Sequence, residues 1–190
     1  MKKHFCFSWL KTVLHDGMKK IKVWKLLPAL FTILFLSDLS AQTVERLKDR
    51  LLMPEVVEAL EPKLVSLVSD VHPAIYIADG NVTVVGKETP SQDLKTVYSD
   101  AGSVDRLYDT NADFTNIKLI VIKIRSSQES DLRVDLSRMG SFEKLKYILF
   151  LFEYEACGGG SDACLVDMVR EIVAGNMDRV TILYQISIPQ

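Results

Sequence analysis

The chain reads Phe114-Thr-Asn-Ile-Lys-Leu-Ile-Val-Ile-Lys-Ile124, and 28 residues later it reads Phe142-Glu-Lys-Leu-Lys-Tyr-Ile-Leu-Phe-Leu-Phe152. Each copy is a short approach that begins with Phe, followed by an apolar run of strand length. A third copy, Met177-Asp-Arg-Val-Thr-Ile-Leu-Tyr-Gln-Ile-Ser187, begins 35 residues after the second. Strands separated by long connections indicate a mainly parallel sheet, because parallel neighbours need a crossover between them.

The segments between the copies predict further elements. Residues 161–174 predict a helix before the third strand, with Ser161 or Asp162 as its N-cap and Gly175 at its end. Residues 132–136 alternate between apolar and polar side chains and predict a small extra strand.

Aligning the three copies divides their side chains between two faces of the sheet. One face holds Ile117, Leu119, Val121, Leu145, Tyr147, Leu149, Leu151, Val180, Ile182, Tyr184 and Ile186. The other holds Ile120, Ile122, Ile124, Ile148, Phe150 and Phe152 from the first two strands, and Leu183, Gln185 and Ser187 from the third. Strands that are apolar on both faces belong in a sheet covered on both sides.

Two interpretations of that second face remain open. The N-terminal helices can cover it. Alternatively, part of it forms an open apolar ligand face for a lipid, a peptide or a partner protein, built from Ile120, Ile122, Ile124, Ile148, Phe150 and Phe152.

The region before the repeats predicts helices and a hairpin. Residues 43–71 carry apolar side chains at steps of three and four, and Pro54 and Pro62 divide them into two or three short helices. Residues 74–77 and 82–85 are β-rich runs on either side of Asp79-Gly80-Asn81, which predicts a β-hairpin. Residues 86–113 are polar and predict mostly loop, with a short helix at residues 104–108.

The repeats of residues 110–190 resemble short, irregular leucine-rich-repeat-like units. The resemblance rests on Phe114 and Phe142, on Ile117 and Leu145, and on the strands after them, and the Asn that such repeats place after the strand is missing. The expected fold is α/β, with N-terminal helices and a hairpin followed by a small, mainly parallel sheet of such strand-connection-strand units. A small α/β sandwich with a mainly parallel sheet explains the same pattern.

The N-terminal region predicts a secretory signal peptide at residues 18–41. Four lysines at positions 19, 20, 22 and 25 precede an apolar run of about 11 residues, and Ala41 is small enough for the cleavage position. The alternative, a retained membrane anchor, needs roughly 20 apolar residues. We therefore expect residues 1–17 to be a start-site extension and residues 42–190 to be one exported domain, in the periplasm, the cell envelope or the extracellular space.

The predicted domain is acidic and contains two cysteines. Residues 1–41 hold 7 of the 23 basic and 2 of the 25 acidic residues, which leaves a formal charge of −7 on residues 42–190. This charge disfavours nucleic acid and anionic membranes as partners, so the membrane is expected to matter only during export. Cys157 and Cys164 flank a Gly-rich loop and predict a disulfide, the alternatives being a metal pair or a redox site.

Few residues indicate catalytic or metal chemistry. His72 is the one histidine of residues 42–190 and is more typical of a structural position than of a catalytic base. Asp109, Asn111 and Asp113 match the opening of a calcium loop, but Phe114 and Ile120 occupy positions where that loop needs Gly and Glu. We expect no cofactor and no metal, with these three residues as weak calcium candidates and an Asx-rich turn as the alternative.

The leading functional hypothesis is therefore an exported, non-enzymatic interaction or ligand-binding module. One alternative is a hydrolase that uses carboxylates among Glu153, Glu155, Asp131 and Asp135, which a cleft joining two of them would favour. Another is a structural protein of the cell envelope, for which stable self-association would be the sign. The sequence names no partner or substrate.

Overall fold

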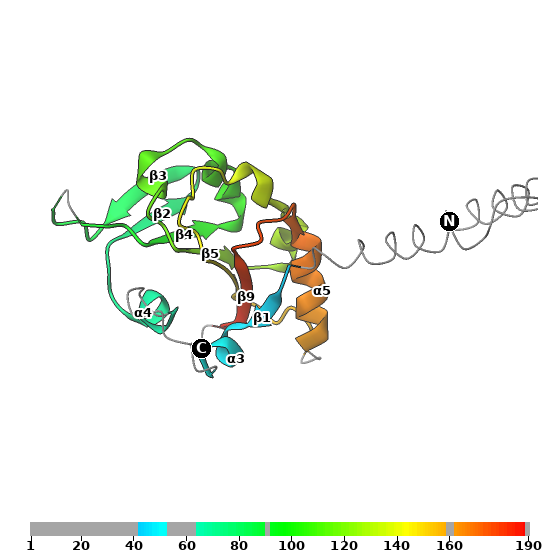
Figure 1. Ribbon diagram of the computed structural model, residues 1–190. Helices are drawn as coiled ribbons and strands as arrows, with labels where there is room; N and C mark the ends of the chain where they lie inside the picture. Colours follow the sequence, from blue (N-terminus) through cyan, green and yellow to red (C-terminus); the bar gives the residue numbers. More distant parts are fainter. Residues whose placement is uncertain (1–41, 53–63, 90–91, 159–161, 189–190) are drawn as a thin grey trace, which may run out of the picture. The chain divides into compact units, whose positions relative to one another are not determined.

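The computed structural model describes residues 42–52, 64–89, 92–158 and 162–188, all within one compact unit, Gln42–Gln190 (Figure 1). Its centre is a seven-stranded sheet with the strand order β1-β9-β7-β5-β4-β2-β3. All neighbours are parallel except β3, which is antiparallel to β2. The strands are β1 (Val44–Arg46), β2 (Ala74–Ala78), β3 (Asn81–Val85), β4 (Thr96–Asp100), β5 (Leu119–Ile124), β7 (Tyr147–Phe152) and β9 (Thr181–Ile186). The predicted α/β fold with a mainly parallel sheet is confirmed.

β3 is at the edge of the sheet beyond β2, β4 lies on the other side of β2, and from β4 to β9 each strand of this sheet lies beside the strand that follows it. The parallel strands from β2 to β9 therefore step in one direction, and right-handed crossovers then place the connections between them on one face. The connections contain 3₁₀ helices, one α-helix and a small two-stranded parallel sheet. These are η2 (Ala101–Tyr108), η3 (Ala112–Phe114), η4 (Ser127–Asp131), β6 (Val134–Asp135), η5 (Leu136–Arg138), α5 (Asp162–Ile172) and β8 (Val173–Ala174).

The larger hydrophobic core lies between the sheet and these connections. Val104 and Leu107 of η2, Phe114 and the α5 side chains pack on β5, β7 and β9 in one cluster. Phe114 stacks on Phe142, with ring centroids 4.6 Å apart. The two Phe residues that open the first two repeats thus meet in the core, which explains why both copies begin with the same side chain.

The six side chains proposed as an open ligand face belong to this core. Ile120, Ile122, Ile124, Ile148, Phe150 and Phe152 are each 0% exposed. The connecting segments cover them, and the N-terminal helices do not. The expectation of an open apolar face here is corrected, because crossovers of the same hand bring the connections between the strands from β2 to β9 onto this side.

The N-terminal helices cover the opposite face. α3 (Leu47–Leu52) and α4 (Leu64–Ser69) contribute Leu47, Leu64 and Leu67 to a second cluster. That cluster contains Leu119, Val121, Leu149 and Leu183 of the sheet. α3 and α4 confirm two of the short helices predicted within residues 43–71, but Val44–Arg46 form the strand β1 instead, and Pro54 and Pro62 lie outside the described residues.

The alignment of the third repeat with the second, made from the sequence, is wrong by one residue. Tyr147 pairs with Thr181 rather than with Ile182, so the structural offset is 34 residues and not 35. A shift of one residue exchanges the two faces of a strand. Ile182 and Tyr184 therefore join the larger core, and Leu183 joins the smaller one.

Several other elements agree with the predictions, and two were missed. The hairpin is confirmed: Asp79 and Gly80 have φ angles of 51° and 73°, as a two-residue type I′ turn requires. The extra strand is shorter than predicted and pairs outside the main sheet. β1 and β4 were missed, and the described residues form an open sheet rather than a leucine-rich-repeat solenoid. No helix in the described ranges is long and apolar enough to cross a membrane.

The predicted disulfide between Cys157 and Cys164 is present. It closes a short loop between the end of β7 and the start of α5. Replacing both cysteines by Ser should lower the free energy of unfolding by about 2–3 kcal/mol, because the unfolded chain regains loop freedom. Urea unfolding of the double variant and of the wild type measures this difference. Equal stabilities would show that the bridge does not restrict the unfolded chain.

Candidate functional site

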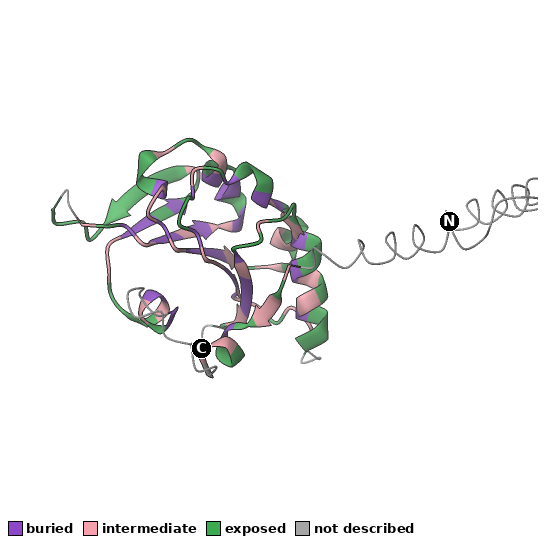
Figure 2. Ribbon diagram, in the orientation of Figure 1, coloured by how far each residue is buried: buried purple, intermediate pink, exposed green. Residues whose placement is uncertain are grey.

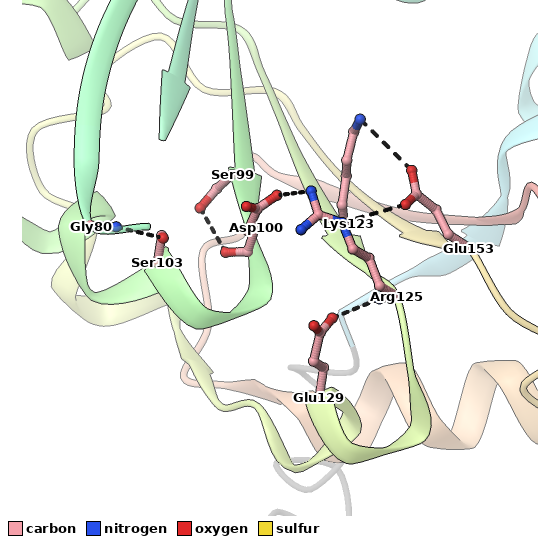
Figure 3. A network of polar contacts seen from close by, with 8 residues as sticks. All are labelled: Gly80, Ser99, Asp100, Ser103, Lys123, Arg125, Glu129 and Glu153. Carbon is pink, nitrogen blue, oxygen red and sulfur yellow. Dashed lines mark hydrogen bonds and ion pairs between the residues drawn. The ribbon is translucent and has the colours of Figure 1, made fainter. Parts of the chain in front are cut away.

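A network of charged side chains lies at the carboxyl edge of the sheet (Figure 3). The Arg125 guanidinium is 2.8 Å from Asp100 Oδ1 and 3.7 Å from Glu153 Oε2. Lys123 Nζ is 3.7 Å from Glu153 Oε1, and the Arg125 backbone N–H donates to Glu129 Oε2 at 2.6 Å. This edge is where open α/β sheets bind ligands, so the network is the first position to consider.

The charges in this network satisfy one another. Both cations contact carboxylates, and each of the three carboxylates contacts a cation or a backbone N–H. Such an arrangement ties the ends of β4, β5 and β7 together. Because every charged group of the network is paired within it, we assign it a structural role.

Removing Arg125 should measure that role. Arg125→Met leaves Asp100 and Glu153, whose side chains are only 19% and 23% exposed, with Lys123 as the remaining cation. We expect the free energy of unfolding to fall by about 0.2–1 kcal/mol, since Arg125 itself is half exposed. Arg133→Met, at an exposed Arg with no described ion pair, is the control. Equal effects in urea unfolding would contradict the assignment.

The opposite, amino edge carries an unusual row of lysines. Lys95, Lys118 and Lys146 precede β4, β5 and β7 at equivalent positions, and their backbones are hydrogen-bonded in series. Burial lowers the pKa of Lys118, and Lys95 and Lys144 lower it further, whereas Asp93 raises it. A lysine whose pKa is lower in the folded chain opposes folding while it is charged, and this penalty decreases as the pH rises through that pKa.

Neutralising Lys118 should therefore stabilise the protein. Directly opposed like charges cost roughly 0.2–1 kcal/mol, so Lys118→Gln should raise the free energy of unfolding by about that amount at low salt and neutral pH. The gain should shrink at high salt, where the repulsion is screened. Lys48→Gln, at an exposed position on α3, is the control. A Lys118→Gln variant less stable than the wild type would contradict the repulsion.

The three residues considered for calcium binding contact different partners. Asp109 Oδ2 is 3.3 Å from Arg106, and Asp113 Oδ1 is 3.9 Å from Lys87 Nζ. Asn111 Oδ1 accepts the Asp113 N–H at 2.9 Å and caps η3, as in an Asx turn. Within the described residues, no group of three or more His, Cys, Asp or Glu side chains could hold a metal ion.

The carboxylates considered for hydrolysis are divided among different elements. Glu153 contacts Lys123 and Arg125 after β7, whereas Asp135 of β6 accepts hydrogen bonds from the Ser137 N–H and hydroxyl. Asp131 ends η4, and Glu155 follows β7 near the disulfide. His72 Nε2 lies 2.6 Å from Thr96 Oγ1, and Thr96 is 0% exposed, so this pair is structural.

A pocket of about 460 Å³ lies beside α3 and the end of β9. Its lining is Arg46, Leu47, Lys48, Leu51, Gln185 and Ile186. Arg46 is already paired with Asp162 at 3.1 Å. The described lining contains no acid, no histidine and no hydroxyl, and its one amine, Lys48, is exposed, so the pocket offers no general acid–base pair.

Four of the seven large apolar side chains that are exposed among the described residues lie together at the β3 end of the sheet. All five residues of β3 are exposed, as Figure 2 shows along the strand. Val82, Val84 and Val85 are 44%, 40% and 50% exposed, and Tyr76 on the neighbouring strand is 43% exposed. We call Tyr76 and residues 81–85 the edge surface.

The valines of the edge surface extend rows of apolar side chains that begin in the hydrophobic core. Val84 and Val82 pair with Ile75 and Ile77 of β2, which are 0% and 1% exposed, so apolar rows extend from the covered sheet onto an uncovered strand. On the other face, Tyr76 stacks on Tyr98 with ring centroids 5.0 Å apart. Burial raises the pKa of Tyr98, and Tyr76 adds to this effect, so the Tyr98 hydroxyl keeps its proton.

The backbone of β3 is also open along one side. In a two-residue hairpin the residues next to the turn, Ala78 and Asn81, form a hydrogen-bonded pair, and pairs then alternate. Asn81, Thr83 and Val85 therefore direct their backbone groups toward β2, and Val82 and Val84 direct theirs outward. Edge strands usually carry a charge, a proline or a bulge that prevents pairing, and β3 has none of these.

Sequence reasoning found the hairpin but not its importance. The run Val82-Thr83-Val84-Val85 between Asn81 and Gly86 contains no charge, which is unusual for an edge strand and was the available signal. Comparisons with protein-family models, with curated proteins and with solved structures give no match for this chain.

Proposed function

We propose that the protein is an exported, non-enzymatic interaction module that binds an extended segment of a partner along β3. The observation that carries the proposal is that all five residues of β3, an uncharged strand at the end of the sheet, are exposed. An added strand would take up the outward backbone groups of Val82 and Val84. This is recognition by β-strand addition, in which main-chain hydrogen bonds supply affinity and side-chain contacts supply specificity.

The side chains of the edge surface favour an apolar partner segment. Val82 and Val84 lie on one face and Val85 and Tyr76 on the other, so an added strand finds apolar contacts on both sides. The surface contains no charged residue, whereas the domain as a whole is acidic. Along residues 81–85 the partner segment is therefore recognised by shape and backbone pairing rather than by charge.

The leucine-rich-repeat-like description of the sheet also remains a proposal. Its support is a recurring pair of an aliphatic residue and Lys before each strand: Leu94-Lys95, Ile117-Lys118 and Leu145-Lys146. The first pair precedes β4, the strand that the repeat alignment missed. In this proposal the repeated units form the rigid support that holds the hairpin.

A display selection of random peptides against the purified protein would test strand addition. Selected peptides should be extended and apolar, and in NMR titrations they should shift the amide resonances of residues 81–85 most. Val84→Lys should weaken binding roughly tenfold or more, because it places a charge on the edge. Val65→Lys, at a valine of α4 that is 50% exposed, is the matched control. Peptides that bind elsewhere, or equally well to both variants, would refute the proposal.

A further inference from the structure

We propose that the segment bound by β3 is the β3 of a second copy of this chain, paired antiparallel with Thr83 opposite Thr83. The inference rests on the proposed function and specifies its partner. Two sheets would then join into one continuous sheet across a two-fold axis. Such an interface is isologous, so the same surface must be complementary to itself.

The alternating direction of the backbone N–H and C=O groups along β3 limits the possible alignments of two paired β3 strands. Only Val82 and Val84 direct their N–H and C=O groups outward from β3, because the other three residues pair with β2. In an antiparallel pair, residues whose N–H and C=O groups point toward the partner strand lie opposite residues of the partner that do the same. Symmetric pairing within the strand can therefore be centred on Val82, on Thr83 or on Val84.

Two of these centres conflict with the structure. Pairing centred on Val82 would require the backbone of Gly80, whose N–H donates to Ser103 Oγ at 3.1 Å (Figure 3). The Gly80 carbonyl also accepts from Arg106 Nε at 2.9 Å. Pairing centred on Val84 would require Gly86, where a φ of 75° takes the chain out of the extended conformation. Pairing centred on Thr83 needs only Val82 and Val84, which are available.

The side chains complement one another in the remaining alignment. Val82 of each copy lies beside Val84 of the other, so the rows from Ile75 and Ile77 continue into the second sheet. Thr83 meets Thr83 on the opposite face, and cross-strand Thr pairs are favourable.

The ends of the strand add charge complementarity. In the sequence Asp79-Gly-Asn-Val-Thr-Val-Val-Gly-Lys87, Val and Gly recur at equal distances on either side of Thr83, and the two ends carry opposite charges. Antiparallel pairing centred there brings Asp79 of each copy to the end where Lys87 of the other lies. Among the described residues, Lys87 is paired with Asp113 at a long distance, 3.9 Å from Nζ to Oδ1. Opposite charges at both ends favour this alignment over a shifted one.

The association itself can be tested by sedimentation velocity. The full chain would be expressed in a bacterial host with an export pathway, so that Asn81 in its Asn81-Val-Thr83 sequon carries no glycan, and the purified form would be identified by mass. We expect a dimer that dissociates on dilution. Val84→Lys should raise its dissociation constant roughly tenfold or more, and Val65→Lys should leave it unchanged.

The alignment is tested by charge reversal and by a cross-link. Asp79→Lys and Lys87→Asp should each weaken the dimer, and the double variant should recover it. Thr83→Cys should form an intermolecular disulfide readily, because directly opposed Cβ atoms lie about 4.5–5.5 Å apart. Val85→Cys should cross-link more slowly, since Val85 faces Asn81 of the second copy. No rescue and no preference for Thr83→Cys would overturn this alignment.

The outcomes separate this inference from the proposed function. A protein that stays monomeric at all concentrations, yet binds selected peptides at residues 81–85, would overturn self-pairing alone. A monomer that also binds no peptide there would overturn both. A dimer insensitive to Val84→Lys would place the interface elsewhere and refute self-pairing.

Discussion

The burial of the inward rows of β5, β7 and β9 beneath the connecting segments is the interaction on which the rest of the structure depends. Ile122, Phe150 and Tyr184 lie side by side across these strands, and all three belong to the larger core. Because the parallel strands from β2 to β9 step across the sheet in one direction, the connections between them form one continuous layer. This layer leaves the opposite face to α3 and α4, and it ends at β2. The exposure of β3 follows from where the layer stops.

The strand content was predictable because the apolar runs are long and repeat with recognisable approaches. β5, β7 and β9 lie within the predicted runs, and the hairpin followed from Asp79-Gly80. β4 was not predicted because Thr96, Ser99 and Asp100 dilute its apolar pattern, although Thr96 and Ser99 are buried. β1 has three residues and gains its strand character only from pairing with β9. Such elements depend on tertiary contacts, which local pattern does not contain.

The candidate site was harder to predict than the fold, for a physical reason. An apolar strand has the same sequence pattern whether a neighbouring layer covers it or not. Sequence therefore assigned Ile120 and Phe150 to a possible open face, although both are buried, whereas Val82 and Val84 of the hairpin are exposed. Which strand is left uncovered is decided by the direction of the crossovers. That direction is a property of the whole chain rather than of any one segment.

The pairing of β1 with β9 has a consequence for how the chain folds. A side-chain hydrogen bond from Gln42 to the Val180 carbonyl spans 138 residues, and it lies beside the same contact. The strands from β2 to β9 can add to the sheet in the order in which they are made, each finding a neighbour close in sequence. β1 emerges first yet must wait for the last strand. A chain that is still incomplete therefore has unpaired strands at both ends of its sheet. Slow pairing of β1 with β9 would then set the period in which the chain is most prone to aggregate.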